Sequence, residues 1–200
     1  MGGHAFCKTQ KSKEKEMIEY VYLLQHSYQQ QYYYSDRYYT EIKNLGDYSS
    51  KEEAESVIEF YKTLKGFKDH PDGFHITEFK LDEHHCKDGF VIPEGATEIK
   101  GYDMEDFELE NAKKAHEYSL FSLQHYFEYK DKNDCYPEEV RELGYYSSWE
   151  KGMEAKAHYK AMKGFKDLPD DCFYLEGCVL NRKGWTEGFV TIEADEPEEA

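Results

Sequence analysis

The chain has 200 residues and a net charge of −17, and 16% of its residues are aromatic, including 19 tyrosines. This aromatic content is enough for a packed core and excludes a wholly disordered chain. Nucleic acids and anionic membranes are bound mainly through Lys and Arg, so the charge argues against both as direct partners. It favours a basic protein partner, although solubility alone would explain the charge equally well.

A long internal repeat determines the domain organisation. Residues 46–72 recur at 144–170, with 14 of the 27 positions identical. A repeat of this length indicates two copies of one folding unit. We therefore expect a flexible arm, a first unit, an acidic linker, a second unit and an acidic tail, at residues 1–16, 17–92, 93–116, 117–192 and 193–200.

The first unit opens with segments that favour strands. Residues 18–26 and 38–45 are rich in Tyr, Val, Ile and Leu, and a polar, Tyr-rich segment separates them. They predict a hairpin with a long loop. Later, residues 74–81 and their counterpart, residues 173–180, predict one further strand in each unit.

A helix follows the hairpin in each unit. Ser49 with Glu52, and Ser147 with Glu150, have the spacing of a capping box. The helix should run for about 15 residues and end at a left-handed glycine, Gly66 or Gly164. Each unit then reads β-β-α-β, with the repeated Gly-Phe-Val as a possible edge strand. The predicted fold class is α+β, a small antiparallel sheet with one helix packed on it.

The linker is acidic, with seven acids and one lysine between residues 94 and 110. Residues 104–114 have helix potential. The tail, EADEPEEA, is acidic and typical of disorder.

The cysteines and the N-terminus indicate a reducing environment. The five cysteines do not recur at equivalent positions of the two copies, as a disulfide framework would. The N-terminus lacks the apolar stretch of a signal peptide, and no segment is long and apolar enough to span a membrane. We expect a cytoplasmic protein.

One cluster contains ligand-type side chains, His84, His85 and Cys86. These residue types bind zinc, but consecutive side chains point in different directions. The second copy has no ligands there, and its Trp185 replaces Cys86, which indicates an apolar packing position. The three residues are weak metal candidates, and we predict no metal and no cofactor.

Two repeated motifs supply candidate binding residues. His26 and His125 each follow a Gln, and each could act as a base or bond a loop carbonyl. The Gly-Phe-Lys-Asp-x-Pro motif places Phe67 with Asp69, and Phe165 with Asp167. These side chains could contact a partner, or the Phe could pack on its helix while the Asp forms the turn.

Tyrosines are concentrated in the first hairpin, at Tyr32, Tyr33, Tyr34 and Tyr38. Tyr is enriched at protein interfaces because it combines contact area with a polar tip. These residues form a candidate binding surface, or they simply cover the sheet.

The ordered elements G-x-Y-S-S, G-F-x-D-x-P and W-x-E-G-F resemble an uncharacterised bacterial family of small domains of unknown function, here in tandem copies. The second copy keeps the last element as Trp185 to Phe189, whereas the first reads Cys86 to Phe90. The resemblance implies a compact α+β fold and brings no activity or catalytic residue.

The sequence predicts a non-enzymatic, acidic protein-binding module that engages a basic partner, as an immunity or inhibitor protein does. One alternative is a small-molecule or peptide sensor with its ligand between the repeats. The other is a metal-dependent enzyme that uses His84, His85 and Cys86.

Overall fold

The computed structural model describes residues 18–31, 38–101, 112–133 and 135–190. The predicted arm and tail lie outside these residues. The strands are β1 (Tyr20–Gln31), β2 (Tyr38–Tyr48), β3 (Phe74–Lys80), β4 (Thr97–Lys100), β5 (Phe121–Lys130), β6 (Glu138–Tyr146) and β7 (Phe173–Gly177), and two helices are α1 (Lys51–Tyr61) and α3 (Trp149–Lys160).

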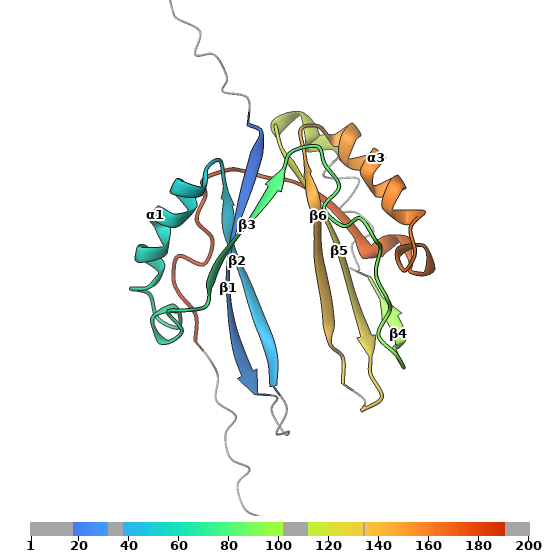
Figure 1. Ribbon diagram of the computed structural model, residues 1–200, viewed down its shortest axis with the longest axis horizontal. Coiled ribbons are helices and arrows are strands. Elements are labelled where there is room, and N and C mark those ends of the chain that lie inside the picture. Colours follow the sequence, from blue (N-terminus) through green and yellow to red (C-terminus); the bar gives the residue numbers. More distant parts are fainter. Residues whose placement is uncertain (1–17, 32–37, 102–111, 134, 191–200) are drawn as a thin grey trace, which may run out of the picture.

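The strands form two antiparallel sheets, which confirms the α+β class. The first sheet has the order β2-β1-β3, and the second has β4-β5-β6 with β7 also paired to β5. Helix α1 lies on the outer side of the first sheet and α3 on the outer side of the second, so the sheets lie between the helices (Figure 1). The predicted hairpin is confirmed, and β1 continues through the polar residues to Gln31.

Strand alternation gives each sheet two different faces, because successive side chains point to opposite sides. Leu24 packs in the core beside α1, whereas Leu23 packs in a separate cluster together with Tyr145 of β6. We call the sheet surfaces that face away from the helices the inner faces. Leu23 of β1 and Tyr145 of β6 therefore lie on inner faces.

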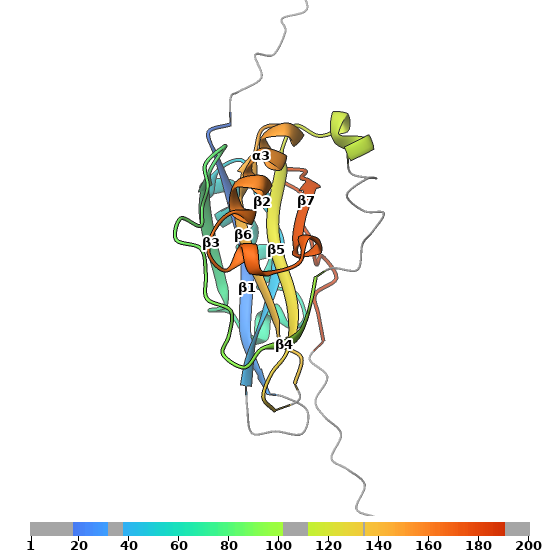
Figure 2. The ribbon, with the colours of Figure 1, turned by 90° about the vertical axis from the view of Figure 1, so that its right-hand side faces the viewer.

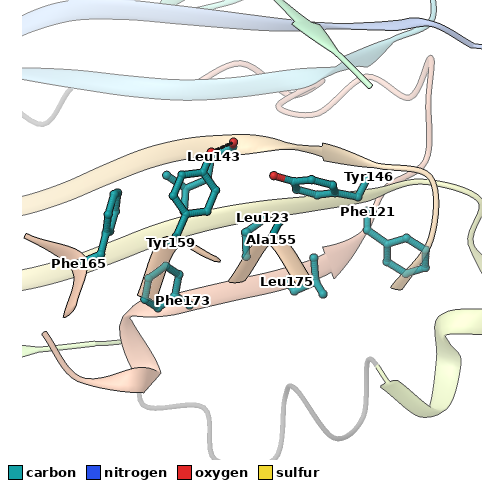
Figure 3. Packing of buried hydrophobic residues seen from close by; sticks show 9 residues of the cluster. All are labelled: Phe121, Leu123, Leu143, Tyr146, Ala155, Tyr159, Phe165, Phe173 and Leu175. Carbon is teal, nitrogen blue, oxygen red and sulfur yellow. Dashed lines mark hydrogen bonds between the residues drawn. The ribbon is translucent and has the colours of Figure 1, made fainter. Parts of the chain in front are cut away.

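Each helix encloses an aromatic core against its own sheet. We call the part of the chain with β1 to β3 and α1 the first half, and the part with β5 to β7 and α3 the second half. In the second half, Tyr159 donates from its hydroxyl to the Leu143 carbonyl oxygen at 2.7 Å. Figure 3 shows the nine residues of this cluster, in which Phe165 and Phe173 lie beside Tyr159. Tyr61 makes the equivalent bond to Leu45 at 3.0 Å in the first half.

The predicted helix caps are wrong by one residue. Ser50 and Ser148 are the N-caps, and their hydroxyls accept from the backbone amides of Glu53 and Lys151. The preceding serines, Ser49 and Ser147, instead bond residues from the opposite half of the chain. In each Ser-Ser pair, the first serine therefore contacts the opposite half and the second serine caps the helix.

The helices are also shorter than predicted, at 11 and 12 residues. Helix α1 ends at Tyr61 because tight bonds from Thr63 and Leu64 back to Phe60 and Tyr61 close its last turn. Gly66 and Gly164 have positive φ, 83° and 88°, but with ψ of −57° and −59° they lie outside the left-handed helical region, so the predicted left-handed cap is wrong. They lead into the 3-10 turns Phe67–Asp69 and Phe165–Asp167 rather than ending the helices.

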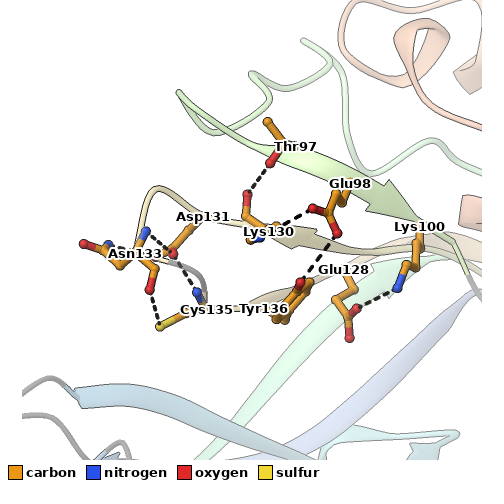
Figure 4. Close-up of polar contacts among 9 residues, drawn as sticks. All are labelled: Thr97, Glu98, Lys100, Glu128, Lys130, Asp131, Asn133, Cys135 and Tyr136. Carbon is orange, nitrogen blue, oxygen red and sulfur yellow. Dashed lines mark hydrogen bonds and ion pairs between the residues drawn. The ribbon is translucent and has the colours of Figure 1, made fainter.

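Strand β4 lies inside the predicted linker and pairs with β5. The Thr97 hydroxyl donates to the Lys130 carbonyl oxygen, and the Glu98 carboxylate forms an ion pair with the Lys130 ammonium (Figure 4). The Lys100 ammonium lies 4.0 Å from the Glu128 carboxylate. Figure 2 shows β4 and β7 on one side of β5, at its two ends. The predicted helix at 104–114 falls mostly outside the described residues, and residues 112–114 are helical.

The segments that follow β3 and β7 cross between the halves. Residues 82–90, here called the first strap, run along the second half, and residues 181–189, the second strap, run along the first half. The predicted edge strand at each Gly-Phe-Val is wrong, since these residues form no ladder. Phe90 and Phe189 instead pack in the core of the opposite half.

No helix among the described residues is both long and apolar enough to cross a membrane. The four cysteines that the structure describes are all free thiols.

Candidate functional site

The inner faces meet at one end and are open at the other. Near the meeting end, Val21 and Leu23 are buried, and they pack with Tyr145 of β6. Farther along the same faces, Ile42 is 56% exposed, Val140 57% and Tyr38 63%. In Figure 1 the strands β1 and β5 lie farther apart towards the hairpin turns than at the end near β3. The apolar side chains on both inner faces are exposed in this part.

A cavity of about 560 Å³ lies between the halves, next to the buried end of the inner faces. Its walls come from both sheets and from the second strap, and they include Asp47, Tyr145, Gln124, Glu176, Arg182 and Trp185. The volume is in the range of small-ligand sites.

Two carboxyl groups of the cavity wall are desolvated. Burial raises the pKa of Asp47, although the Tyr145 hydroxyl donates to it at 2.5 Å and partly offsets the effect. Burial also raises the pKa of Glu176. The Tyr174 hydroxyl, which donates to Glu176 at 3.1 Å, partly offsets this effect, and the nearby charge of Asp47 adds to it. Both carboxyl groups therefore ionise at a higher pH than they would in water, and a positive charge close to them would oppose this shift.

A third carboxyl group, Glu142, lies behind the wall. Burial raises its pKa well above the usual range, and Asp47 and Glu176 add to the effect. The Ser122 hydroxyl donates to Glu142 at 2.5 Å. Within the described part of the chain, none of these three carboxyls has an ion pair. The cavity wall thus combines two carboxyl groups that have no ion pair within the described residues, Asp47 and Glu176, with two basic side chains, Arg182 and Lys183.

The two predicted histidines lie in the cores, away from this cavity. His26 and His125 are both 0% exposed, and burial lowers the pKa of each, that of His125 to about 4. The His26 Nε2 atom bonds the His70 carbonyl at 2.8 Å, as the structural interpretation expects. Neither ring reaches solvent, and their role in binding stays a prediction.

Phe67 and Phe165 are also fully buried. They therefore contact only other side chains of the core, including those of the straps. Phe67 meets Phe189 edge-on at 4.8 Å, and Phe165 meets Phe90 at 4.7 Å. Both partners belong to straps from the opposite half. Asp69 and Asp167 are exposed on the 3-10 turns, where their amides bond Gly66 and Gly164.

Of the four tyrosines predicted to form a binding surface, the structure describes one. Tyr38 begins β2 opposite Gln31, and its side chain extends from the open end of the inner face. Tyr32, Tyr33 and Tyr34 lie outside the described residues.

The three weak metal candidates are not brought together. The His84 ring stacks on the His158 ring, with the ring centroids 4.3 Å apart. His85 packs on Phe79, and Cys86 packs against the core between α3 and the second sheet. Among the described residues, no group of three or more His, Cys, Asp or Glu side chains is placed to hold a metal ion.

Sequence reasoning missed the cavity residues Asp47 and Glu176, and Glu142 behind them. A signal was available, because each acid has an uncharged residue in its place in the other copy, namely Tyr145, Asn44 and Thr77. A charge present in only one copy of a strand is not required by the fold. Such positions are candidates for function.

The comparisons with known proteins identify a domain but not an activity. Residues 19–90 match a family model described as a domain of unknown function (DUF7336). The match ends at Phe90, the last residue of the first strap. No curated protein and no solved structure matches the chain.

Proposed function

We propose that the chain is a non-enzymatic module of two copies of one β-β-α-β unit, and that it binds a basic segment of a partner protein between its sheets. The observation that carries the proposal is the pair of desolvated carboxyl groups in the cavity wall, Asp47 and Glu176, beside inner faces that keep apolar side chains exposed. An immunity or inhibitor protein is one form that such a module takes.

The charges favour a cationic guest. Asp47 and Glu176 in the wall, and Glu142 behind it, have no ion pair within the described residues, even though Arg182 and Lys183 also line the cavity. A Lys or Arg side chain of a partner that reaches the two wall carboxyls would supply one. Its approach would lower the raised pKa values of these carboxyls and favour their charged forms. The net charge of −17 would also speed encounter with a basic partner.

The exposed apolar residues would supply contact area along the open inner faces. Ile42 and Val140 occupy equivalent positions of the two copies and are almost equally exposed. Tyr38, at the open end, provides an aromatic side chain of the kind enriched at interfaces. A basic segment that also carries apolar side chains would match both parts of the surface.

The test compares two double variants that change the net charge equally. Ile42→Lys with Val140→Lys alters the inner faces, whereas Val91→Lys with Val190→Lys alters exposed valines elsewhere. Each purified protein is used to capture partners from nuclease-treated lysate, with salt elution and mass spectrometry. We expect a basic protein to be captured by the wild type and the control and lost with the inner-face variant. Equal capture by both variants would refute the proposal.

A second candidate function is a sensor of a small molecule or peptide, which the size of the cavity favours. A ligand that binds only the folded state raises the melting temperature. Thermal-shift measurements with diamines, polyamines and amino acids would reveal such a ligand. Stabilisation that disappears in Glu176→Gln, without any basic protein captured, would favour this candidate.

A further inference from the structure

The two halves are joined by reciprocal backbone bonds from the straps. Each strap donates amide hydrogens to a strand and to the segment after the helix in the opposite half. The first strap donates from Asp82, His85 and Phe90 to Tyr145, Leu143 and Lys163, and the second from Asn181, Gly184 and Phe189 to Asp47, Leu45 and Lys65, over 2.7 to 3.2 Å.

Each strap ends with a phenylalanine in an aromatic socket of the opposite half. Phe189 stacks on Tyr28 at 5.0 Å, meets Phe67 edge-on, and lies beneath the Lys43 ammonium at 4.8 Å. Phe189 is only 8% exposed. This socket is built entirely from residues of the first half.

The second socket repeats the arrangement. Phe90 contacts Phe165 at 4.7 Å and Phe127 at 5.8 Å, and the Arg141 guanidinium lies over its ring at 4.9 Å. Arg141 occupies the position equivalent to Lys43. A cation above the strap phenylalanine is thus common to both sockets.

The other end of each strap is held by a side chain. Asn181 accepts from the Ser49 amide at 3.0 Å, and Asp82 accepts from the Ser147 amide at 2.8 Å. Both strap residues have the same left-handed conformation, with φ of 60° and 62°. Each serine immediately precedes a helix N-cap, so the strap also fixes the start of the helix.

Only glycine fits directly before the strap phenylalanine. Gly188 has a φ of 74°, and a Cβ there would lie 2.5 Å from the Lys65 carbonyl oxygen. The Lys163 carbonyl oxygen blocks the same position at Gly89. A socket therefore selects a Gly-Phe pair by backbone shape as well as by ring packing.

We propose that each socket is a self-recognition site whose partner is the Gly-Phe strap of another unit of the same kind. The two halves then associate without a covalent link, and a second copy of this chain can supply either half by exchange. Such exchange of an identical element between units forms a closed, isologous pair. This inference rests on the strap contacts and is independent of the ligand proposed for the cavity.

The experiment uses the full chain with a protease recognition sequence placed within residues 102–111. The protein is purified folded and then cut, which leaves β1 to β4 on one fragment and β5 to β7 on the other. We expect the cut protein to elute at the mass of the intact chain in light scattering at micromolar concentration. Two cut samples with different tags should also exchange fragments on mixing. Separation into two folded fragments, or no exchange over days, would overturn the proposal.

Variants test whether the straps hold the fragments together. Phe90→Ala and Phe189→Ala in the cut protein should each weaken association roughly tenfold or more, as for a buried aromatic anchor. Val91→Ala and Val190→Ala, beside the straps but exposed, are the controls. If Phe189→Ala prevents folding, Asn181→Gly keeps the backbone conformation and removes only the bonds to Ser49. Association unchanged in every strap variant would assign the pairing to the sheet interface and refute the role of the sockets.

Discussion

At the scale of single residues, a histidine and a carboxyl group respond to pH in opposite directions. His125 is fully buried among Phe165, Phe173 and Phe127, and its two ring nitrogens have no hydrogen-bond partner within the described residues. Desolvation and the nearby Arg141 lower its pKa. The fold therefore keeps this imidazole neutral, as part of an aromatic cluster.

His125→Phe should remove an acid-dependent loss of stability. The folded pKa of His125 is about 4, below the unfolded value of 6.5, so its contribution is complete above pH 6.5 and is lost as pH falls towards 4. That contribution is about 3 kcal/mol, from about 1.4 kcal/mol per pKa unit. Urea unfolding from pH 4 to 8 should show a smaller acid loss in His125→Phe than in the wild type. His75→Gln, at an exposed position, is the control, and equal slopes in all three proteins would contradict the assignment.

Glu142 gives the opposite dependence. Burial raises its folded pKa above the unfolded value, so its contribution is complete below the unfolded pKa and is lost as pH rises through the folded pKa. Glu142→Gln should therefore raise the free energy of unfolding at pH 7 and above and have little effect at pH 4. Glu138→Gln, on the exposed part of the same strand, is the matched control. A Glu142→Gln protein less stable at pH 8 would show that the carboxylate is compensated.

At the scale of elements, the sequence predicted the strands and helices from local patterns, and it failed where the two halves meet. The strand at 18–26 extends to Gln31 because its polar side chains alternate onto an inner face that is open there. The S-x-x-E spacing selected Ser49 and Ser147, since nothing local shows that Asn181 and Asp82 engage them. The Gly-Phe-Val segments were predicted as edge strands for the same reason. Their partners lie in the other half of the chain.

Substitution of the two serines before α3 separates capping from strap binding. Ser148→Ala removes the N-cap and should lower the free energy of unfolding by about 1 kcal/mol. This loss should be the same with and without the Asp82 side chain. Ser147→Ala removes a hydroxyl bond to Asp82 and another from Lys151, so its cost should be smaller in an Asp82→Gly background. A double-mutant cycle measured by urea unfolding distinguishes the two serines. The prediction fails if Ser148→Ala, rather than Ser147→Ala, is the change that couples to Asp82.

At the scale of the whole molecule, the repeated sequence and the folded bodies do not coincide. The domain match ends at Phe90, yet residues 82–90 pack on the second half and residues 181–189 complete the first. The sequence therefore predicted two units and could not predict that each closes the core of the other. The cavity escaped prediction for the same reason, because its walls come from segments far apart in the chain.

This exchange should make the molecule unfold as one cooperative unit. Removing the second strap from its socket exposes the core of the first half, and the first strap then loses the sheet that orients it. Calorimetry should show a single transition whose calorimetric and van't Hoff enthalpies agree. Phe189→Ala should lower the melting temperature of that whole transition by roughly 10 °C, from a core loss of about 3–5 kcal/mol. Hydrogen exchange should then accelerate in β5 as well as in β1, although Phe189 contacts only the first half's socket. Two resolved transitions, with hydrogen exchange in β5 unaffected by Phe189→Ala, would mean that the halves fold independently. The straps would then pack on halves that are already folded.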